Sequence, residues 1–180
     1  MKETYPKAIE FVLAAEGGFS DDAGDSGGAT MQGITWRDAA AYREIDPLTL
    51  RTDAEQSRLV KSLAETEIQA IYRTRYWEAV SGDALPYPLD MVLFDSGVNL
   101  GVGAAVILLR LAMGLPAFPP TMRATLATVQ EIGSHLPVVV SKVLELRRAR
   151  YRRIAHGHNA QFLKGWLARV EHLEAAIKEK

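Results

Sequence analysis

Residues 16–35 of the chain read EGGFSDDAGDSGGATMQGIT. Six glycines and three aspartates lie between positions 17 and 33, and this composition favours turns and permits at most a short hairpin. The residues before this loop predict a helix that Gly17 and Gly18 end. Its apolar residues recur at helical spacing: Tyr5, Ala8, Ile9, Val12 and Leu13.

The residues after the loop predict further helices. The sequences Thr35-Trp36-Arg37-Asp38 and Thr52-Asp53-Ala54-Glu55 look like capping boxes. They predict helices over 36–45 and over 53–77, the second with a break near Ala64. Later apolar periodicity predicts helices over 89–98, 102–113, 121–132, 136–156 and 162–180. The fold class that follows is all-α, with one small β-hairpin after the first helix.

The proline-rich segment 115–120 is the best candidate for a domain boundary. We therefore expect one region over residues 1–115 and a helical C-terminal region over 116–180. We expect the two regions to pack as one unit, because 180 residues suit a single core or a core with a small lobe.

Composition excludes several classes of protein. The 21 basic residues nearly balance the 22 acidic ones, which argues against nucleic acid as a partner, although the arginines of 147–153 make one helix locally basic. The chain has no cysteine, and His156 and His158 have no partners at metal-ligand spacing, so we predict neither a metal nor a cofactor. The apolar stretch 91–115 contains charges and glycines, which argues against stable membrane insertion.

Glu16 is the candidate for acid chemistry. It lies at the last turn of the first helix, where the helix dipole is negative, and the apolar residues Phe11, Val12 and Leu13 precede it. Both features favour a protonated carboxyl, which a general acid needs near neutral pH. The alternative is an ordinary surface glutamate at a helix end.

A second carboxylate follows in the loop. Asp25 comes nine residues after Glu16, and a returning hairpin can place it across a cleft from Glu16. Two opposed carboxyl groups are the minimal equipment for glycoside hydrolysis. Thr30, on the hairpin, can help Asp25 to hold a water molecule. A calcium loop of the EF-hand type does not fit, because Gln32 or Gly33 occupies the position of the bidentate glutamate.

Residues 16–35 closely resemble the signature of glycoside hydrolase family 108. Its members are lysozyme-like N-acetylmuramidases of phage endolysins and bacterial lysis proteins, with a pattern of E-G-G-aromatic, D-x-x-D, G-G-A-T and G-I-T. The resemblance implies a lysozyme-like fold, with Glu16 as the catalytic glutamate and Asp22 and Asp25 as the loop aspartates. Phe19 stands where Tyr is commoner, and Met31-Gln32 replaces an Asn-Tyr pair. The second departure changes side chains beside the acid and so bears on substrate preference.

The resemblance extends along most of the chain. Residues 71–77 (IYRTRYW) are similar to the family's Y-x-x-x-Y-W segment, and 93–101 (LFDSGVNLG) to its F-D-x-x-V-N-x-G helix. The arginines and aromatic residues of 147–170 look like the predicted peptidoglycan-binding region that usually follows. This implies that residues 116–180 bind the cell wall.

Five residues are candidates for contacts with the sugar chain: Asp22, Gln32, Tyr76, Trp77 and Asn99. For at least one of Tyr76 and Trp77, packing in the core is the stronger alternative. Asp95 and Asn99 share a helix face with apolar residues, so a buried polar network is the alternative to a cleft wall. We favour the buried network for Asp95 and leave Asn99 open.

The leading hypothesis is therefore an endo-acting N-acetylmuramidase that cuts the β-1,4 bond between N-acetylmuramic acid and N-acetylglucosamine. Glu16 acts as general acid, and Asp25 acts as base, nucleophile or loop support. The alternatives are a wall-binding or secretion-associated protein without catalysis, and a nucleic-acid-binding module. We expect a monomer whose partner is bacterial peptidoglycan. The N-terminal residues lack a signal peptide, so we expect cytoplasmic synthesis followed by holin-type or other release to the wall.

Overall fold

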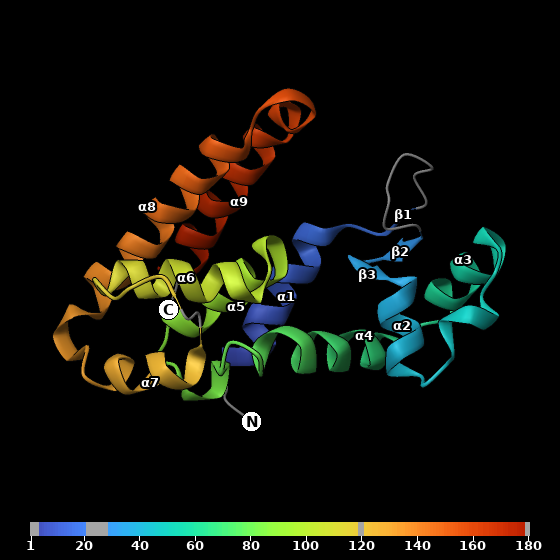
Figure 1. Ribbon diagram of the computed structural model, residues 1–180, viewed down its shortest axis with the longest axis horizontal. Coiled ribbons are helices and arrows are strands. Elements are labelled where there is room, and N and C mark those ends of the chain that lie inside the picture. Colours follow the sequence, from blue (N-terminus) through green and yellow to red (C-terminus); the bar gives the residue numbers. More distant parts are fainter. Residues whose placement is uncertain (1–3, 21–28, 119–120, 179–180) are drawn as a thin grey trace. The chain divides into compact units, whose positions relative to one another are not determined.

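The computed structural model describes residues 4–20, 29–118 and 121–178 (Figure 1). The chain forms two compact units. Residues 9–75 form the first, which we call the sheet unit. Residues 1–8 and 76–180 form the second, which we call the helical unit. Both sides of the predicted boundary at 115/116 belong to the helical unit, and the assignment of catalysis and wall binding to the two sides stays a prediction.

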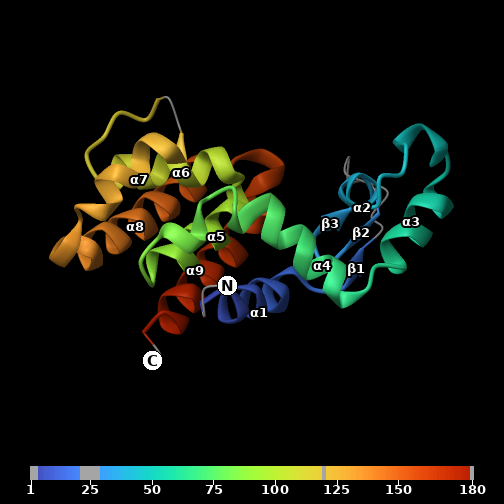
Figure 2. The same ribbon diagram turned by 90° about the horizontal axis from the view of Figure 1, so that it is seen from below.

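Helix α1 (Thr4–Glu16) begins in the helical unit and ends in the sheet unit. In its described part, the sheet unit also contains three short strands, three further α-helices and a 3₁₀ turn. These elements are β1 (Phe19–Ser20), β2 (Thr30–Met31), β3 (Ile34–Thr35), α2 (Trp36–Tyr42), the 3₁₀ turn η1 (Pro47–Thr49), α3 (Asp53–Lys61) and α4 (Glu65–Tyr72). Figure 2 shows the strands beside α2 and α3.

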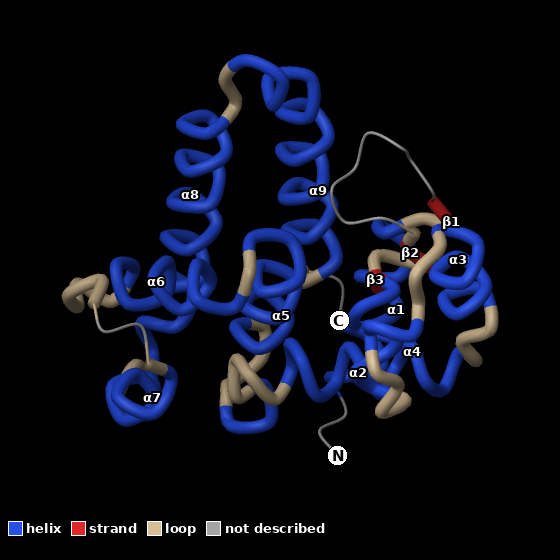
Figure 3. The backbone as a smooth tube through the Cα atoms, turned by 45° about the vertical axis from the view of Figure 1, so that its right-hand side comes forward, coloured by secondary structure: helices blue, strands red, loops and turns tan. Residues whose placement is uncertain are grey.

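The helical unit follows a π-helical turn, η2 (Arg73–Trp77), within which the chain crosses between the units. Its elements are η3 (Gly82–Ala84), α5 (Leu89–Leu100), α6 (Val102–Ala112), α7 (Met122–Gln130), η4 (Gly133–His135), α8 (Leu136–Ile154), η5 (Gly157–Phe162) and α9 (Leu163–Ala176). Figure 3 shows how fully helices dominate the described chain, which confirms the predicted fold class.

The sheet is antiparallel with the order β1-β2-β3, so it has one strand more than the predicted hairpin. The additional strand comes from the turn between Met31 and Ile34, which pair with each other. Gln32 and Gly33 form this turn with φ angles of 47° and 77°. Two positive φ angles in succession are typical of a type I′ turn, which joins adjacent antiparallel strands.

Side-chain caps begin two helices where the sequence predicted them. The Thr52 hydroxyl accepts from the Glu55 amide, and the Glu55 carboxylate accepts from the Thr52 amide at 2.9 Å, which completes a capping box. Thr35 caps α2 by accepting from the Asp38 amide at 3.2 Å. This helix ends at Tyr42, earlier than the predicted position 45.

The core of the helical unit forms around α5. Every residue from Leu89 to Gly97 in α5 is buried, and α6 and α8 pack against this helix. Trp77 is fully buried beside α5, with edge-to-face contacts to Tyr5 and Phe94 at centroid distances of 5.1 and 5.5 Å. The continuous burial of α5 explains its lack of a clear polar face.

Candidate active site

Glu16 ends α1 and is half-buried in the sheet unit. Its carboxyl group lies against Gly33, the second residue of the β2–β3 turn. A Cβ atom placed on Gly33 would be 2.7 Å from Glu16 Oε2 and 2.8 Å from the hydroxyl oxygen of Tyr72. The Glu16 carboxyl and the Tyr72 hydroxyl therefore converge on the same face of Gly33, which has room for them because glycine has no side chain.

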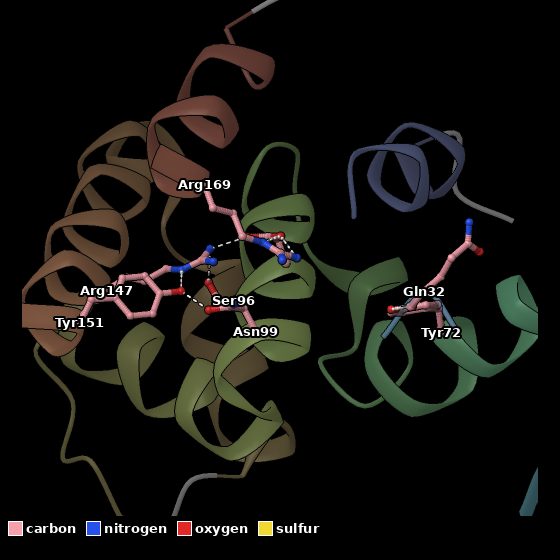
Figure 4. A network of polar contacts seen from close by, with 8 residues as sticks. Gln32, Tyr72, Ser96, Asn99, Arg147, Tyr151 and Arg169 are labelled. Atoms are coloured by element: carbon pink, nitrogen blue, oxygen red, sulfur yellow. Dashed lines mark hydrogen bonds and ion pairs between the residues drawn. The ribbon is translucent and has the colours of Figure 1, made fainter. Parts of the chain in front are cut away.

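Two hydrogen bonds hold the turn that carries Gly33. The Tyr72 hydroxyl, at the end of α4, donates to the Gln32 carbonyl at 2.7 Å. The Gln32 amide donates to the Gly18 carbonyl at 3.1 Å, two residues after Glu16. The turn is thus hydrogen-bonded both to the end of α4 and to Gly18, in the segment that follows Glu16. In Figure 4 the Gln32 side chain extends away from Tyr72, so the backbone of Gln32 makes this contact.

The predicted loop carboxylates, Asp22 and Asp25, lie outside the described residues, so their roles stay predictions. Thr30 is described. It lies half-buried in β2, where it pairs with Ser20 and Thr35. The sheet therefore fixes the backbone of Thr30, which lies five residues after Asp25 in the sequence. Its support of that aspartate also stays a prediction.

The two aromatic candidates differ in burial. Trp77 is 0% exposed, and its indole N–H donates to Asp83 at 2.9 Å. A ring enclosed in the core has no face free for a sugar, so its prediction as a substrate contact is wrong and the core alternative holds. Tyr76 is half-buried in η2. Its contact with substrate stays a prediction.

Asp95 and Asn99 belong to a polar network in the helical unit, which Figure 4 shows around the labelled Asn99 and Arg147. The buried Asp95 carboxylate pairs with Arg147 Nη1 at 2.5 Å and with Arg169 Nη2 at 2.8 Å. Arg147 Nε also donates to the Tyr151 hydroxyl at 2.9 Å, and that hydroxyl donates to Asn99 Oδ1. The favoured interpretation of Asp95 as part of a buried network is confirmed. Asn99 is half-buried and bonded to Tyr151, and its contact with sugar stays a prediction.

Burial also changes the acidity of this network. It raises the pKa of the Tyr151 phenol, against the opposing effect of the neighbouring Arg147 guanidinium. The phenol is therefore neutral at physiological pH and can donate its hydrogen to Asn99. The network joins α5 to α8 and α9, and its described contacts all lie within the helical unit.

Tyr72 is the site residue that the sequence interpretation missed. It is 1% exposed, and its hydroxyl lies beside Glu16 at Gly33. The signal was present, because Tyr72 is the first aromatic residue of the Y-x-x-x-Y-W segment. Tyr76 and Trp77 at the end of that segment were the predicted sugar contacts, whereas Tyr72 at its start, in the last turn of α4, is the residue that reaches the acid.

A metal site and a membrane-spanning helix each place requirements on the described residues. Within residues 4–20, 29–118 and 121–178, no three histidine, aspartate or glutamate side chains come together as a metal site requires. No helix in the same ranges has both the length and the apolar character needed to cross a membrane.

The chemistry that the described geometry supports is proton transfer by a carboxyl group. Glu16 is partly shielded from water at a helix end, beside a tyrosine hydroxyl and a hydrogen-bonded turn. A carboxyl held in this way can protonate a leaving oxygen if a substrate places one within hydrogen-bond distance. The second half of a hydrolysis reaction needs a group that activates water or attacks carbon.

Comparison with known proteins adds independent information. Residues 9–101, about half of the chain, match the family described as glycosyl hydrolase 108. The structure is similar to that of SagA from Brucella abortus, with a TM-score of 0.80 and 30% sequence identity, and the match covers 100% of this chain and 98% of that one. No curated protein sequence matches the chain.

Proposed function

The chain belongs to the glycosyl hydrolase 108 family, and from this premise we propose that it is an endo-acting N-acetylmuramidase. It hydrolyses the β-1,4 bond between N-acetylmuramic acid and N-acetylglucosamine in bacterial peptidoglycan, for lysis of the cell wall. The observation that carries the proposal is the position of Glu16. Glu16 lies within the region that matches the family, and its carboxyl converges with the Tyr72 hydroxyl on the same face of Gly33.

In the proposed mechanism, Glu16 donates its proton to the glycosidic oxygen as the bond to the anomeric carbon breaks. Asp25, supported by Thr30, takes a proton from a water molecule that attacks the opposite face of the sugar. This route inverts the anomeric configuration. A nucleophilic Asp25 would instead retain it, and NMR of the first product formed distinguishes the two outcomes.

Glu16→Gln tests the assignment of the acid. The amide keeps the size of the side chain but has no acidic proton to give, so we expect release of reducing ends from purified peptidoglycan to fall by roughly 10²- to 10⁴-fold. Glu10→Gln is the matched control, because it makes the same change at an exposed position of the same helix. Full activity of Glu16→Gln would overturn the proposal.

Mass spectrometry of the digest identifies the bond that is cut. A new reducing end on N-acetylmuramic acid supports a muramidase, and one on N-acetylglucosamine contradicts it. Tight binding to sacculi without any cleavage by the unmodified chain would instead favour a wall-binding or secretion-associated protein.

We also propose that residues 116–180 bind the wall. The support is a row of aromatic rings on the α8–α9 hairpin. Tyr151 stacks on Trp166 at 5.3 Å, Trp166 lies 5.9 Å from Phe162, and Phe162 is 44% exposed. Tyr151 is 1% exposed and so supports the row from within, whereas the exposed face of Phe162 suits a sugar ring. Phe162→Ala should weaken sedimentation of the full chain with insoluble peptidoglycan, whereas the same change at the exposed Phe118, outside the row, should not.

A further inference from the structure

We propose that Tyr72 is a positioning residue for Glu16 and acts through the Gln32–Gly33 turn. The inference rests on the proposed role of Glu16 as the general acid. Its first support is the hydrogen bond from Tyr72 to the Gln32 carbonyl at 2.7 Å, which spans 40 residues of sequence. A carbonyl oxygen can only accept, so the hydrogen in this bond comes from Tyr72.

The second support is the conformation of Gln32. Its φ of 47° lies in the left-handed region, which residues with a side chain adopt at a cost in energy. A non-glycine residue remains there when its surroundings hold it. The bond from Tyr72 to the Gln32 carbonyl and the bond from the Gln32 amide to Gly18 provide that hold.

The third support is the contact between the turn and the acid. Gly33, the residue after Gln32, has a φ of 77° and faces the Glu16 carboxyl so closely that a Cβ would be 2.7 Å from Oε2 and 3.2 Å from Cδ. The turn therefore limits where the carboxyl can lie. If the turn lost its hydrogen bond to Tyr72, Gly33 would shift, and the Glu16 carboxyl that lies against Gly33 would change its orientation.

The fourth support is the burial of Tyr72. It is 1% exposed in the last residue of α4, and its neighbours Ile68 and Ile71 are also buried. The hydroxyl that donates to the Gln32 carbonyl therefore belongs to a side chain enclosed by the core.

The first test is Tyr72→Phe, which removes the hydroxyl and keeps the ring. We expect kcat on purified peptidoglycan to fall by roughly 10- to 100-fold, because a displacement of about 1 Å at a reacting group can cost about 10²-fold. We expect KM to change by less than about twofold, since the substrate contacts remain. Tyr42→Phe is the matched control in the sheet unit, and its exposed ring should leave kcat unchanged.

The second test separates the action of the turn from a direct effect of the hydroxyl. Gln32→Gly keeps the backbone carbonyl and removes the cost of a positive φ at this position. The turn can then keep its conformation without the hydrogen bond from Tyr72. Tyr72→Phe should therefore lower kcat much less when Gln32→Gly is also present. An unchanged penalty in this double-mutant cycle would overturn action through the turn.

The third test changes the turn directly and leaves Tyr72 in place, so it does not depend on whether Tyr72→Phe folds. Gly33→Ala places a methyl group against Glu16, and Gly114→Ala imposes a similar backbone strain, at φ 73°, in open space. We expect roughly 100-fold loss of kcat in the first and none in the second, with folding of both checked by circular dichroism. Equal kcat values in the two would overturn the inference.

Glu16→Gln, measured beside these variants, keeps the two proposals distinguishable. Activity in Glu16→Gln would overturn the proposed function itself. Loss of activity in Glu16→Gln combined with an unchanged kcat in Tyr72→Phe would leave the function standing and overturn the positioning role.

Discussion

Replacing Asp95 by asparagine should strongly destabilise the helical unit. Asp95 is fully buried and its carboxylate faces two guanidinium groups, those of Arg147 and Arg169, whose side chains are 0% and 10% exposed. Asparagine has nearly the same shape but no charge, so the variant leaves two positive charges in the interior without compensation. Removing one partner of a buried ion pair costs about 3–5 kcal/mol.

This loss is a large fraction of the free energy of unfolding of a typical domain, which is about 5–15 kcal/mol, so it is readily measured. Urea unfolding followed by circular dichroism gives the free energy of unfolding of Asp95→Asn and of the unmodified chain by linear extrapolation. We expect a difference of about 3–5 kcal/mol, caused by uncompensated charge rather than by lost volume.

The control is a more exposed pair between α8 and α9, the two helices that carry the arginine partners of Asp95. Arg148 and Glu174 lie 2.5 Å apart, but their side chains are 23% and 37% exposed. Glu174→Gln should therefore cost only about 0–1 kcal/mol. A loss below about 1 kcal/mol for Asp95→Asn, or a loss equal to that of Glu174→Gln, would refute the argument from burial.

Further predictions concern other parts of the molecule. Hydrogen bonds from Arg43 lower the pKa of Glu67 to about 2, below its value of about 4.3 in an unfolded chain. The stabilisation from this pair is therefore complete above pH ~4.3 and is lost as the pH falls towards 2. Glu67→Gln should flatten this acid decline in the melting temperature. Gly82→Ala should cost about 1–3 kcal/mol in thermal unfolding, because its Cβ would lie 2.4 Å from Trp77 Cε2. Gly103→Ala, with open space in α6, should instead stabilise by about 0.4–1 kcal/mol, and destabilisation there would contradict the reasoning.

Local signals in the sequence predicted most of the helices. The capping box at Thr52 and the break near Ala64 depend on residues close in sequence, and both appear in the structure. The third strand was missed because it depends on Gln32 adopting a positive φ, which glutamine seldom does. In the structure, the Gln32 carbonyl accepts a hydrogen bond from Tyr72, which lies 40 residues away in the sequence.

The candidate site shows the same division between local and distant information. A helix-end glutamate followed by a glycine-rich loop was enough to identify Glu16 as the acid candidate. Sequence spacing could not show that Trp77 packs between Tyr5 and Phe94 rather than at the surface. The role of Tyr72 was equally hidden, because only the packing of α4 beside the turn brings its hydroxyl to Glu16.

The division of α1 between the two units has a consequence for folding during synthesis. Residues 9–75 leave the ribosome as a complete unit, whereas the first turns of α1 belong with helices made last. Lys7 donates to the carbonyl of Ala176, 169 residues later, at 2.8 Å. At about 5–20 residues per second this partner appears roughly 10–30 s after Lys7. All residues of the sheet unit have therefore been made while translation continues, and Lys7 finds its partner only when α9 emerges.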